Sequence, residues 1–360
     1  VRVCTVRNRA TNERTYKHHR LRNSMGYKSD KITESIPLHR IAVVSPFTNF
    51  LNDVGTSFER GFRHVGLPVC ALEDANNFVP SHRFWAFLVD TAFSQDIPDL
   101  GFRVGQKYGA NCADPHLVDL LSRSATLYQG LLRASDLINK TISHCQVGIL
   151  QPPRSQHAYF YHSPSCDAHN PAIEQIGWFG VMTLIGMVRA FTAPRWLPTE
   201  IGLMSNQPPQ LHIREHFRGT RIRLSQPYSY VALENTLLSL PPLAQQAAAP
   251  ESPALHCEGL ANDFVSSLNQ LLHSYIQEKD LNIEFAAGLC DMSKRSLQRK
   301  LAENETRYSE LLDRVRFDAA KQMLQDRDRN VADISHVLGY SEPTHFTRAF
   351  RRIAGVTPRV

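Results

Sequence analysis

Cysteine is scarce and irregularly spaced in this 360-residue chain, and no two cysteines are separated by only two residues. Structural zinc sites and thioredoxin-like redox motifs need such close pairs, so neither is predicted. The odd number of cysteines also disfavours the disulfide framework of a secreted protein, and a cytoplasmic location is expected. We expect buried apolar thiols, with a redox sensor as the alternative, among Cys4, Cys70, Cys112, Cys145, Cys166, Cys257 and Cys290.

Long hydrophobic runs are missing as well. The most apolar stretch runs from Ile176 to Val188 and ends at Arg189, which is shorter than the roughly 20 residues that cross a bilayer. No apolar run near the first residue resembles a signal peptide. We therefore expect a buried helix here, and no membrane partner.

An excess of one charge sign occurs only at the start of the chain. Residues 1–34 hold nine Lys or Arg against three acids, whereas the remaining residues hold 31 of each. The net charge of +6 is therefore no argument for nucleic-acid binding by the rest of the chain. A basic segment with few apolar residues cannot bury a core, so residues 1–34 are expected to be a disordered or misassigned leader, with Met25 as an alternative start.

A change in composition predicts two folded parts. From residue 241 the chain reads Pro-Pro-Leu-Ala-Gln-Gln-Ala-Ala-Ala-Pro-Glu-Ser-Pro, which is typical of an interdomain linker. We predict an N-terminal domain over 35–240, a linker over 241–259 and a C-terminal domain over 260–360.

The N-terminal part mixes helical and strand patterns. Leucines at helical spacing alternate with short β-branched and aromatic runs that Gly and Pro separate. An α+β domain is therefore expected. Its predicted helices cover 83–93, 115–140 and 172–191, and its predicted strands cover 147–150, 158–161, 201–204, 220–224 and 230–233.

The C-terminal part is expected to be all-α and to contain one pattern twice. A short helix, a turn and an apolar-x-Arg-x-apolar helix occur around Leu297 and again 49 residues later around Phe346. This is the unit that places side chains in a DNA major groove. Ser293 and Ser341 are the expected caps of the two second helices, and Asn330 is the expected cap of the helix before the second turn.

The outward faces of these helices carry candidate DNA contacts. If Leu297 and Leu301 point inward, the exposed face of the first unit offers Arg and Gln side chains, which can pair with guanine and adenine edges. If Phe346 and Phe350 point inward, the second unit exposes a similar face. The alternative is an ordinary solvated helix surface, which two units in tandem disfavour. The candidates are Lys294, Arg295, Gln298, Arg299, Lys300, Thr344, His345, Thr347 and Arg348.

These residues resemble the AraC/XylS family of bacterial transcription regulators. The matching residues run through Met292-Ser293-Lys-Arg-Ser-Leu297-Gln-Arg299-Lys-Leu301 and Leu338-Gly339-Tyr340-Ser341-Glu-Pro-Thr-His-Phe346-Thr-Arg348-Ala-Phe350 to Gly355-Val-Thr-Pro358. The resemblance implies two helix-turn-helix subdomains joined by a helix over 308–325. It also places Pro343 among the contact residues. Cys290 and Asp291 replace the usual Leu and Gly, which puts the geometry of the first turn in question.

The N-terminal part resembles, more weakly, the effector-domain class of this family that is called arabinose-binding. The resemblance rests on Trp196-x-Pro198, the Pro208-Pro209 break, His216-Phe217, Ile222-Arg-Leu224 and the segment from Leu237 to Pro242. It implies an α+β domain for a small-molecule effector, but does not identify the ligand.

Two histidine patterns offer metal binding as an alternative. His212, Glu215 and His216 match the HxxEH motif of inverted zinc peptidases, but the segment lies between Pro209 and Gly219, where a long helix is not expected. A looser set has irregular spacing and is interpreted as a polar loop: His157, His162, Cys166 and His169.

The sequence thus predicts a DNA-binding transcription regulator that acts as an activator. We expect no enzyme activity, no cofactor and no metal. The expected partners are double-stranded DNA, an unknown small-molecule effector, RNA polymerase and a second copy of the chain. The alternatives are a constitutive DNA-binding dimer without a ligand and, from another class, a metal-dependent hydrolase that uses the HxxEH segment.

Overall fold

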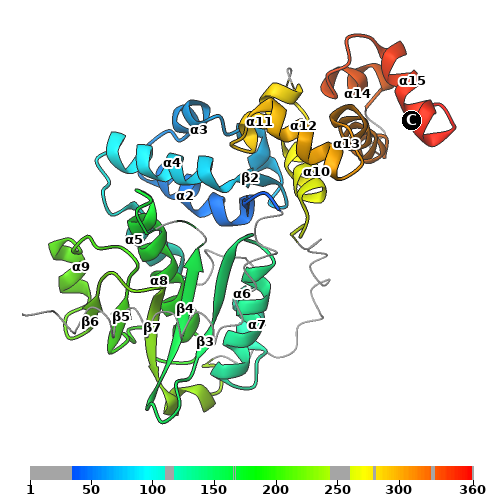
Figure 1. Cartoon of the computed structure of the whole chain (residues 1–360). Helices are drawn as coiled ribbons and strands as arrows, with labels where there is room; N and C mark the ends of the chain where they lie inside the picture. The colour runs from blue at the N-terminus through cyan, green and yellow to red at the C-terminus, as the bar shows by residue number, and fades with distance from the viewer. Residues whose placement is uncertain are drawn as a thin grey trace, which may run out of the picture. The chain divides into compact units, whose positions relative to one another are not determined.

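A computed structural model describes residues 35–109, 117–164, 166, 168–243, 260–278, 281–325 and 329–358. The expectations for the leader, for Met25 and for most of the predicted linker lie outside these residues. Within them, the prediction of an α+β N-terminal part and an all-α C-terminal part is confirmed (Figure 1). No described helix is both long and apolar enough to cross a membrane.

A five-stranded sheet forms one layer of the N-terminal part, in the order β3-β4-β7-β5-β6. The pairs are antiparallel except for β5 with β6. Alternate residues of β4 are buried, because successive side chains of a strand point to opposite faces. The strands are β3 Cys145–Leu150, β4 His157–Pro164, β5 Glu200–Gly202, β6 Arg221–Arg223 and β7 Ser229–Glu234.

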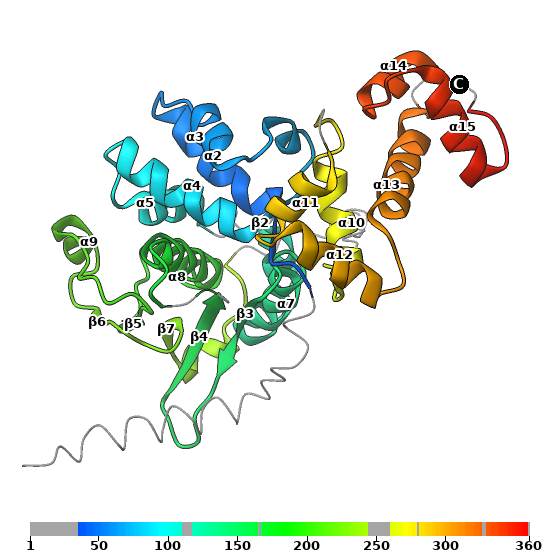
Figure 2. The same ribbon diagram turned by 45° about the horizontal axis from the view of Figure 1, so that its top comes forward.

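Helix α8, Ile173–Arg189, covers one face of this sheet (Figure 2). Its apolar residues, with Trp178 at the centre, build the main core together with Phe160 of β4 and Val231 of β7. The expected buried helix over 172–191 is thereby confirmed. The helix expected over 115–140 is instead two helices, α6 Leu117–Ser122 and α7 Leu127–Asn139, because Thr126 caps a new start by accepting a hydrogen bond from the Gln129 amide.

A second layer of helices lies against α8 and has its own aromatic core. Close packing of α5 on α8 depends on Gly101, where a Cβ atom would lie 2.0 Å from the Gln175 carbonyl oxygen. Only α4 was foreseen, as a helix over 83–93. The elements are α2 Ile41–Asp53, α3 Glu59–Val65, α4 Ser81–Ser94, α5 Leu100–Tyr108 and the antiparallel strands β1 Leu38–Arg40 and β2 Phe78–Pro80.

The described residues of the C-terminal part form six helices around a third core. Ile36, Leu38 and Phe78 belong to this core although they precede it by some 200 residues. The helices are α10 Phe264–Ser274, α11 Ile283–Leu289, α12 Lys294–Glu303, α13 Tyr308–Met323, α14 Val331–Val337 and α15 Pro343–Ala354.

Two buried hydrogen bonds join α10 to the β1–β2 pair. Ser267 Oγ accepts from the Ile36 amide at 3.0 Å, and Ser274 Oγ accepts from the Phe78 amide at 2.7 Å. Both serines are buried. Because buried amides without a partner are costly, these contacts make the strands a structural support of α10.

Candidate nucleic-acid interface and ligand cavity

The two helix-turn-helix units are α11–α12 and α14–α15, and their turns have the same hydrogen bond. The Met292 amide donates to the Ala287 carbonyl at 3.0 Å, and the Tyr340 amide donates to the Ser335 carbonyl at 3.1 Å. Asp291 has a φ of 52° and Gly339 a φ of 74°, so aspartate adopts the left-handed conformation that glycine has in the second unit. The unusual residues at the first turn therefore do not alter its geometry.

Helix α12 presents the expected face. Ser293 caps it by accepting from the Ser296 amide at 3.1 Å, and Leu297 and Leu301 are buried at 0% and 1% exposure. Arg295, Gln298 and Arg299 are exposed. Their common outward direction follows from the burial of the two leucines one turn apart.

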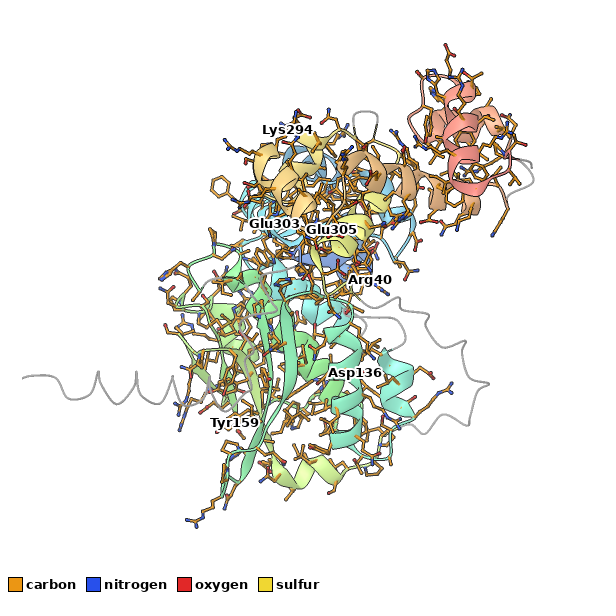
Figure 3. The ribbon with its side chains drawn as sticks, turned by 45° about the vertical axis from the view of Figure 1, so that its right-hand side comes forward. Arg40, Asp136, Tyr159, Lys294, Glu303 and Glu305 are labelled. Carbon is orange, nitrogen blue, oxygen red and sulfur yellow. The ribbon has the colours of Figure 1, made fainter. Side chains whose placement is uncertain are left out.

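Three cations of α12 have partners within the protein. The Lys294 ammonium, on an outward-pointing side chain in Figure 3, lies 2.5 Å from Glu284 Oε1. Arg299 lies 3.7 Å from the Glu303 carboxylate, with both side chains exposed. The Lys300 ammonium lies 4.8 Å from the centre of the Phe264 ring. Exposed pairs of this kind are weak, so phosphates can compete for the first two cations.

Helix α15 is anchored by Phe346 and Phe350, which are buried as expected. Pro343 occupies its first position, where proline is tolerated. The prediction that Ser341 caps this helix is wrong. Glu342 is the N-cap residue, and its side chain makes no capping hydrogen bond. Ser341 Oγ lies instead 3.2 Å from His345 Nδ1, because the helix starts one residue later than in the first unit.

The outward face of α15 is polar. Pro343, Thr344, His345 and Arg348 are exposed. Thr347 is half-buried and donates to the Pro343 carbonyl at 2.9 Å, so its hydroxyl is engaged within the helix. All ten candidate contact residues thus lie on the second helices of the two units, α12 and α15.

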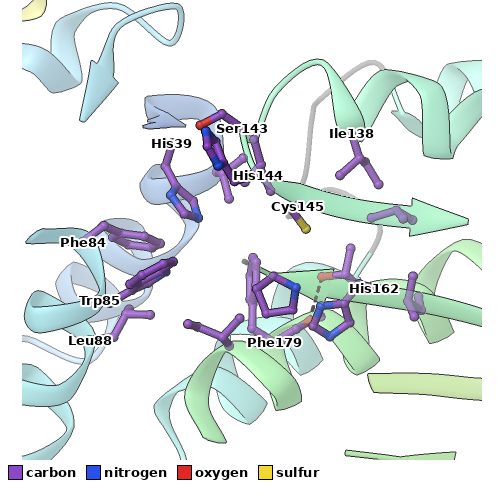
Figure 4. Close-up of a pocket in the computed structure, with 18 of the residues that line it drawn as sticks. His39, Phe84, Trp85, Leu88, Ile138, Ser143, His144, Cys145, His162 and Phe179 are labelled. Atoms are coloured by element: carbon purple, nitrogen blue, oxygen red, sulfur yellow. Dashed lines mark hydrogen bonds between the residues drawn. The ribbon is translucent and has the colours of Figure 1, made fainter. Parts of the chain in front are cut away.

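A cavity of about 80 Å³ lies in the N-terminal part, between α2, α4, α8 and the sheet (Figure 4). Its largest polar side chains are those of His39 on β1, Trp85 on α4, His144 just before β3 and His162 on β4. Burial lowers the pKa of His39 to about 3 and that of His162 to about 4. Both rings are therefore neutral near pH 7.

The sequence did not indicate this cavity. Its walls come from segments more than 100 residues apart, and the sequence pattern around His162 suggested only a metal-binding alternative. The period of two in β4 was the available signal, since it places His162 on the same face as Ala158 and Phe160.

The two metal alternatives gain no support from the geometry. The HxxEH segment forms α9, Leu211–His216, a helix of only six residues. His212 Nε2 bonds the buried Asp99 carboxylate at 2.7 Å, and His216 Nδ1 lies 3.3 Å from Gln106. Within the described ranges, no three His, Cys, Asp or Glu side chains form a group that could hold a metal ion. His162, which belongs to the looser histidine and cysteine set, is buried among core residues. This burial accounts for its position without a metal ion.

Two family models match the chain. One, described as a helix-turn-helix domain, covers residues 286–360. The other, described as the arabinose-binding domain of AraC transcription regulators, covers residues 55–242.

Curated relatives include several regulators. The ornithine utilization regulator of Pseudomonas aeruginosa is 27% identical over 159 residues, which are 42% of this chain and 47% of that protein. An uncharacterized HTH-type regulator of Mycobacterium bovis is 40% identical over 72 residues, 20% and 21% of the two chains. The matches thus span about half or less of these two relatives.

Other matches extend further along the chain. The regulator VirS of Mycobacterium tuberculosis is 23% identical over 330 residues, 87% of this chain and 93% of VirS. The crystal structure of the regulator CdpR from Pseudomonas aeruginosa matches with a TM-score of 0.40 and 17% identity, over 87% of this chain and 95% of that one.

The N-terminal family model alone covers more than half of the chain, and the second model covers the helix-turn-helix units from residue 286 onward. The chain belongs to the AraC family of DNA-binding transcription regulators and carries the N-terminal ligand-binding domain of that family.

Proposed function

We propose that the chain is an effector-controlled transcription activator that binds double-stranded DNA as a homodimer and acts on RNA polymerase. In this proposal α12 and α15 enter two successive major grooves. Bases are read by Arg295, Gln298 and Arg299 in one groove. Thr344, His345 and Arg348 read them in the next, beside Pro343, while Lys294 and Lys300 contact phosphates.

The observation that carries the proposal is the equivalence of the two units. Each has the same turn hydrogen bond, a buried apolar pair and an exposed polar face. One polar helix face is common on any protein surface, but two in matching units favour recognition of DNA over two helical repeats.

The cavity in the N-terminal domain favours control by an effector over a constitutive DNA-binding dimer. Protein interiors are normally filled and their polar groups bonded. A domain that only dimerises has no need for a cavity with neutral polar side chains in its wall. Ornithine, which appears in the name of one relative, is not proposed as the ligand of this chain, because the described cavity wall holds no charged partner for its ammonium groups.

Dimerisation is supported by an exposed apolar face on α6 and α7. Leu132 is 44% exposed, Tyr128 one turn earlier on the same helix is 38% exposed, and Val118 of α6 is 42% exposed. Exposed apolar side chains that share a helix face, as Tyr128 and Leu132 do on α7, are typical of protein interfaces, and a second copy of the chain is the proposed occupant.

The test selects bound fragments from genomic DNA with the full chain and measures gel shifts at several salt concentrations, with light scattering for the oligomeric state. We expect enrichment of one bipartite sequence. Light scattering should show a dimer for the wild-type chain and a monomer for Leu132→Arg. Leu211→Arg, at an exposed position on α9, is the control and should remain a dimer. Recovery of fragments without a common sequence contradicts specific recognition. A promoter reporter that falls rather than rises on expression contradicts activation.

A further inference from the structure

The cavity wall is almost entirely apolar and carries no charge. Aromatic and aliphatic side chains from α2, α4, α8 and the sheet form most of it, and its described residues include no Asp, Glu, Lys or Arg. Burial keeps His39 and His162 neutral, and it holds the Cys145 thiol protonated by raising its pKa to about 12. A charged ligand would lose its hydration there without gaining a counter-ion.

Two buried polar atoms in this wall have no hydrogen-bond partner in the described part of the chain, namely Trp85 Nε1 and His162 Nε2. The other histidine and hydroxyl side chains of the wall are bonded within the protein: His39 to Ser81 at 2.8 Å, His144 to Ser35 at 2.9 Å, Thr183 to the Phe179 carbonyl at 2.8 Å and Ser143 to the backbone of Leu38. An unpaired buried donor or acceptor costs about 1–3 kcal/mol, so these two atoms need an explanation.

The hydrogen-bonding roles of the two atoms are opposite. Trp85 Nε1 carries a hydrogen and can only donate. His162 makes a hydrogen bond to the Gly177 backbone that favours the protonated ring, which means that the ring donates there. Since Nε2 is without a partner, that donor is Nδ1, and Nε2 of the neutral ring is an acceptor.

We propose that the cavity binds an uncharged, largely apolar molecule with one hydroxyl group, such as an aromatic or aliphatic alcohol. A hydroxyl group can accept from Trp85 Nε1 or donate to His162 Nε2, so it can supply a partner that the wall lacks. A sugar is excluded, because its several hydroxyls would meet apolar walls. The cavity of about 80 Å³ exceeds several-fold the roughly 10–15 Å³ that one buried water requires.

The position of His39 connects this cavity to the DNA-binding part. His39 lines the cavity, whereas its neighbour Leu38 packs in the core around α10, because alternate residues of β1 face opposite sides. The Ile36 amide, just before this strand, bonds Ser267 of α10. An occupant that shifts His39 therefore acts on the strand that supports α10. This use of the site rests on the proposed regulatory function.

The test titrates the full chain with benzyl alcohol and three matched probes, with calorimetry and melting temperature as readouts. Toluene lacks the hydroxyl, benzoate adds a charge and L-arabinose replaces the ring by hydroxyls. We expect benzyl alcohol to bind most tightly, toluene about three- to tenfold more weakly through loss of the hydrogen bonds, and benzoate and L-arabinose at least about tenfold more weakly.

Two tryptophan variants locate the site. Trp85→Phe keeps a ring but removes the donor, so the affinity for benzyl alcohol should fall about three- to tenfold. Trp196→Phe, outside the cavity lining, should bind as the wild type does. A bromine atom quenches nearby tryptophan, so 4-bromobenzyl alcohol should quench the emission of the wild type and of Trp196→Phe, but not of Trp85→Phe.

Equal or tighter binding of benzoate or L-arabinose overturns the inference, as does the same quenching in Trp85→Phe or the absence of any binding. Gel shifts on the same preparation without added alcohol separate the two proposals. DNA binding without alcohol binding refutes the inference alone. Alcohol binding without DNA binding, in a further gel shift with the alcohol present as well as in its absence, refutes the proposed function alone.

Discussion

Arg295 and Gln298 are exposed on α12 and make no hydrogen bond or ion pair with the described residues. A paired hydrogen bond to one base is worth ~1–3 kcal/mol of discrimination. Arg295→Ala or Gln298→Ala should therefore weaken the selected site about ten- to a hundredfold and relax its sequence preference. Competition gel shifts with single-base variants of the site measure this.

Lys300→Ala is the matched comparison for base readout. Its ammonium is proposed to contact phosphate, so its loss should weaken all sequences similarly and reduce the salt slope by about one. The contact with Phe264 adds a small loss of stability. An Arg295→Ala variant that behaves like Lys300→Ala would show that Arg295 contacts only the backbone.

His162 should make the stability of the folded chain depend on pH in the acid range. Its pKa is lowered to about 4 in the folded chain, from 6.5 in the unfolded one. Below pH 6.5 the unfolded chain takes up a proton that the folded chain excludes, so stability is full above this pH and is lost as the pH falls toward 4. The slope is about 1.4 kcal/mol per pH unit.

His162→Gln, which does not titrate, should remove this contribution. Urea denaturation between about pH 6.5 and pH 4 compares the two proteins. The free energy of unfolding of the variant should fall less steeply over this range, and parallel curves would contradict the buried neutral ring.

At the scale of elements, α10 depends on strands from the other end of the sequence. Ser267→Ala leaves the buried Ile36 amide without its acceptor, which should cost about 1–3 kcal/mol of unfolding free energy. Ser266→Ala, one residue earlier and exposed, is the control, with an expected change within about 0.5 kcal/mol. Equal losses in chemical denaturation would argue against the docking of α10 on β1 and β2.

Elements with their own periodicity could be predicted from sequence, whereas elements defined by long-range pairing could not. The leucine spacing of α12 and the phenylalanine spacing of α15 fix their inward faces without knowledge of the fold, and the apolar run of α8 predicts its burial. The three-residue strands β1 and β2 have no such pattern, and they exist because Leu38 pairs with Pro80 and packs under α10. The cavity was missed for the same reason, since its wall combines His39 of β1 with residues of α4, α8 and β4.

At the scale of the whole molecule, the support of α10 bears on how independent the DNA-binding part is. A fragment of residues 260–360 retains most of the third core but lacks Ile36, Leu38 and Phe78. We expect it to fold and to bind the selected DNA, with a lower melting temperature than the full chain because the α10 surface becomes exposed. Circular dichroism and gel shift measure both properties. A fragment without helical structure would show that the two parts form one folding unit.

The central claim is that one chain reads two successive grooves with α12 and α15. A hydroxyl-radical footprint of the full chain on its selected site tests it most directly, with Arg295→Ala and Arg348→Ala as paired variants. We expect two protected regions per protomer, roughly 10 base pairs apart, with a different region weakened in each variant. A single protected groove, or one region lost in both variants, would contradict it.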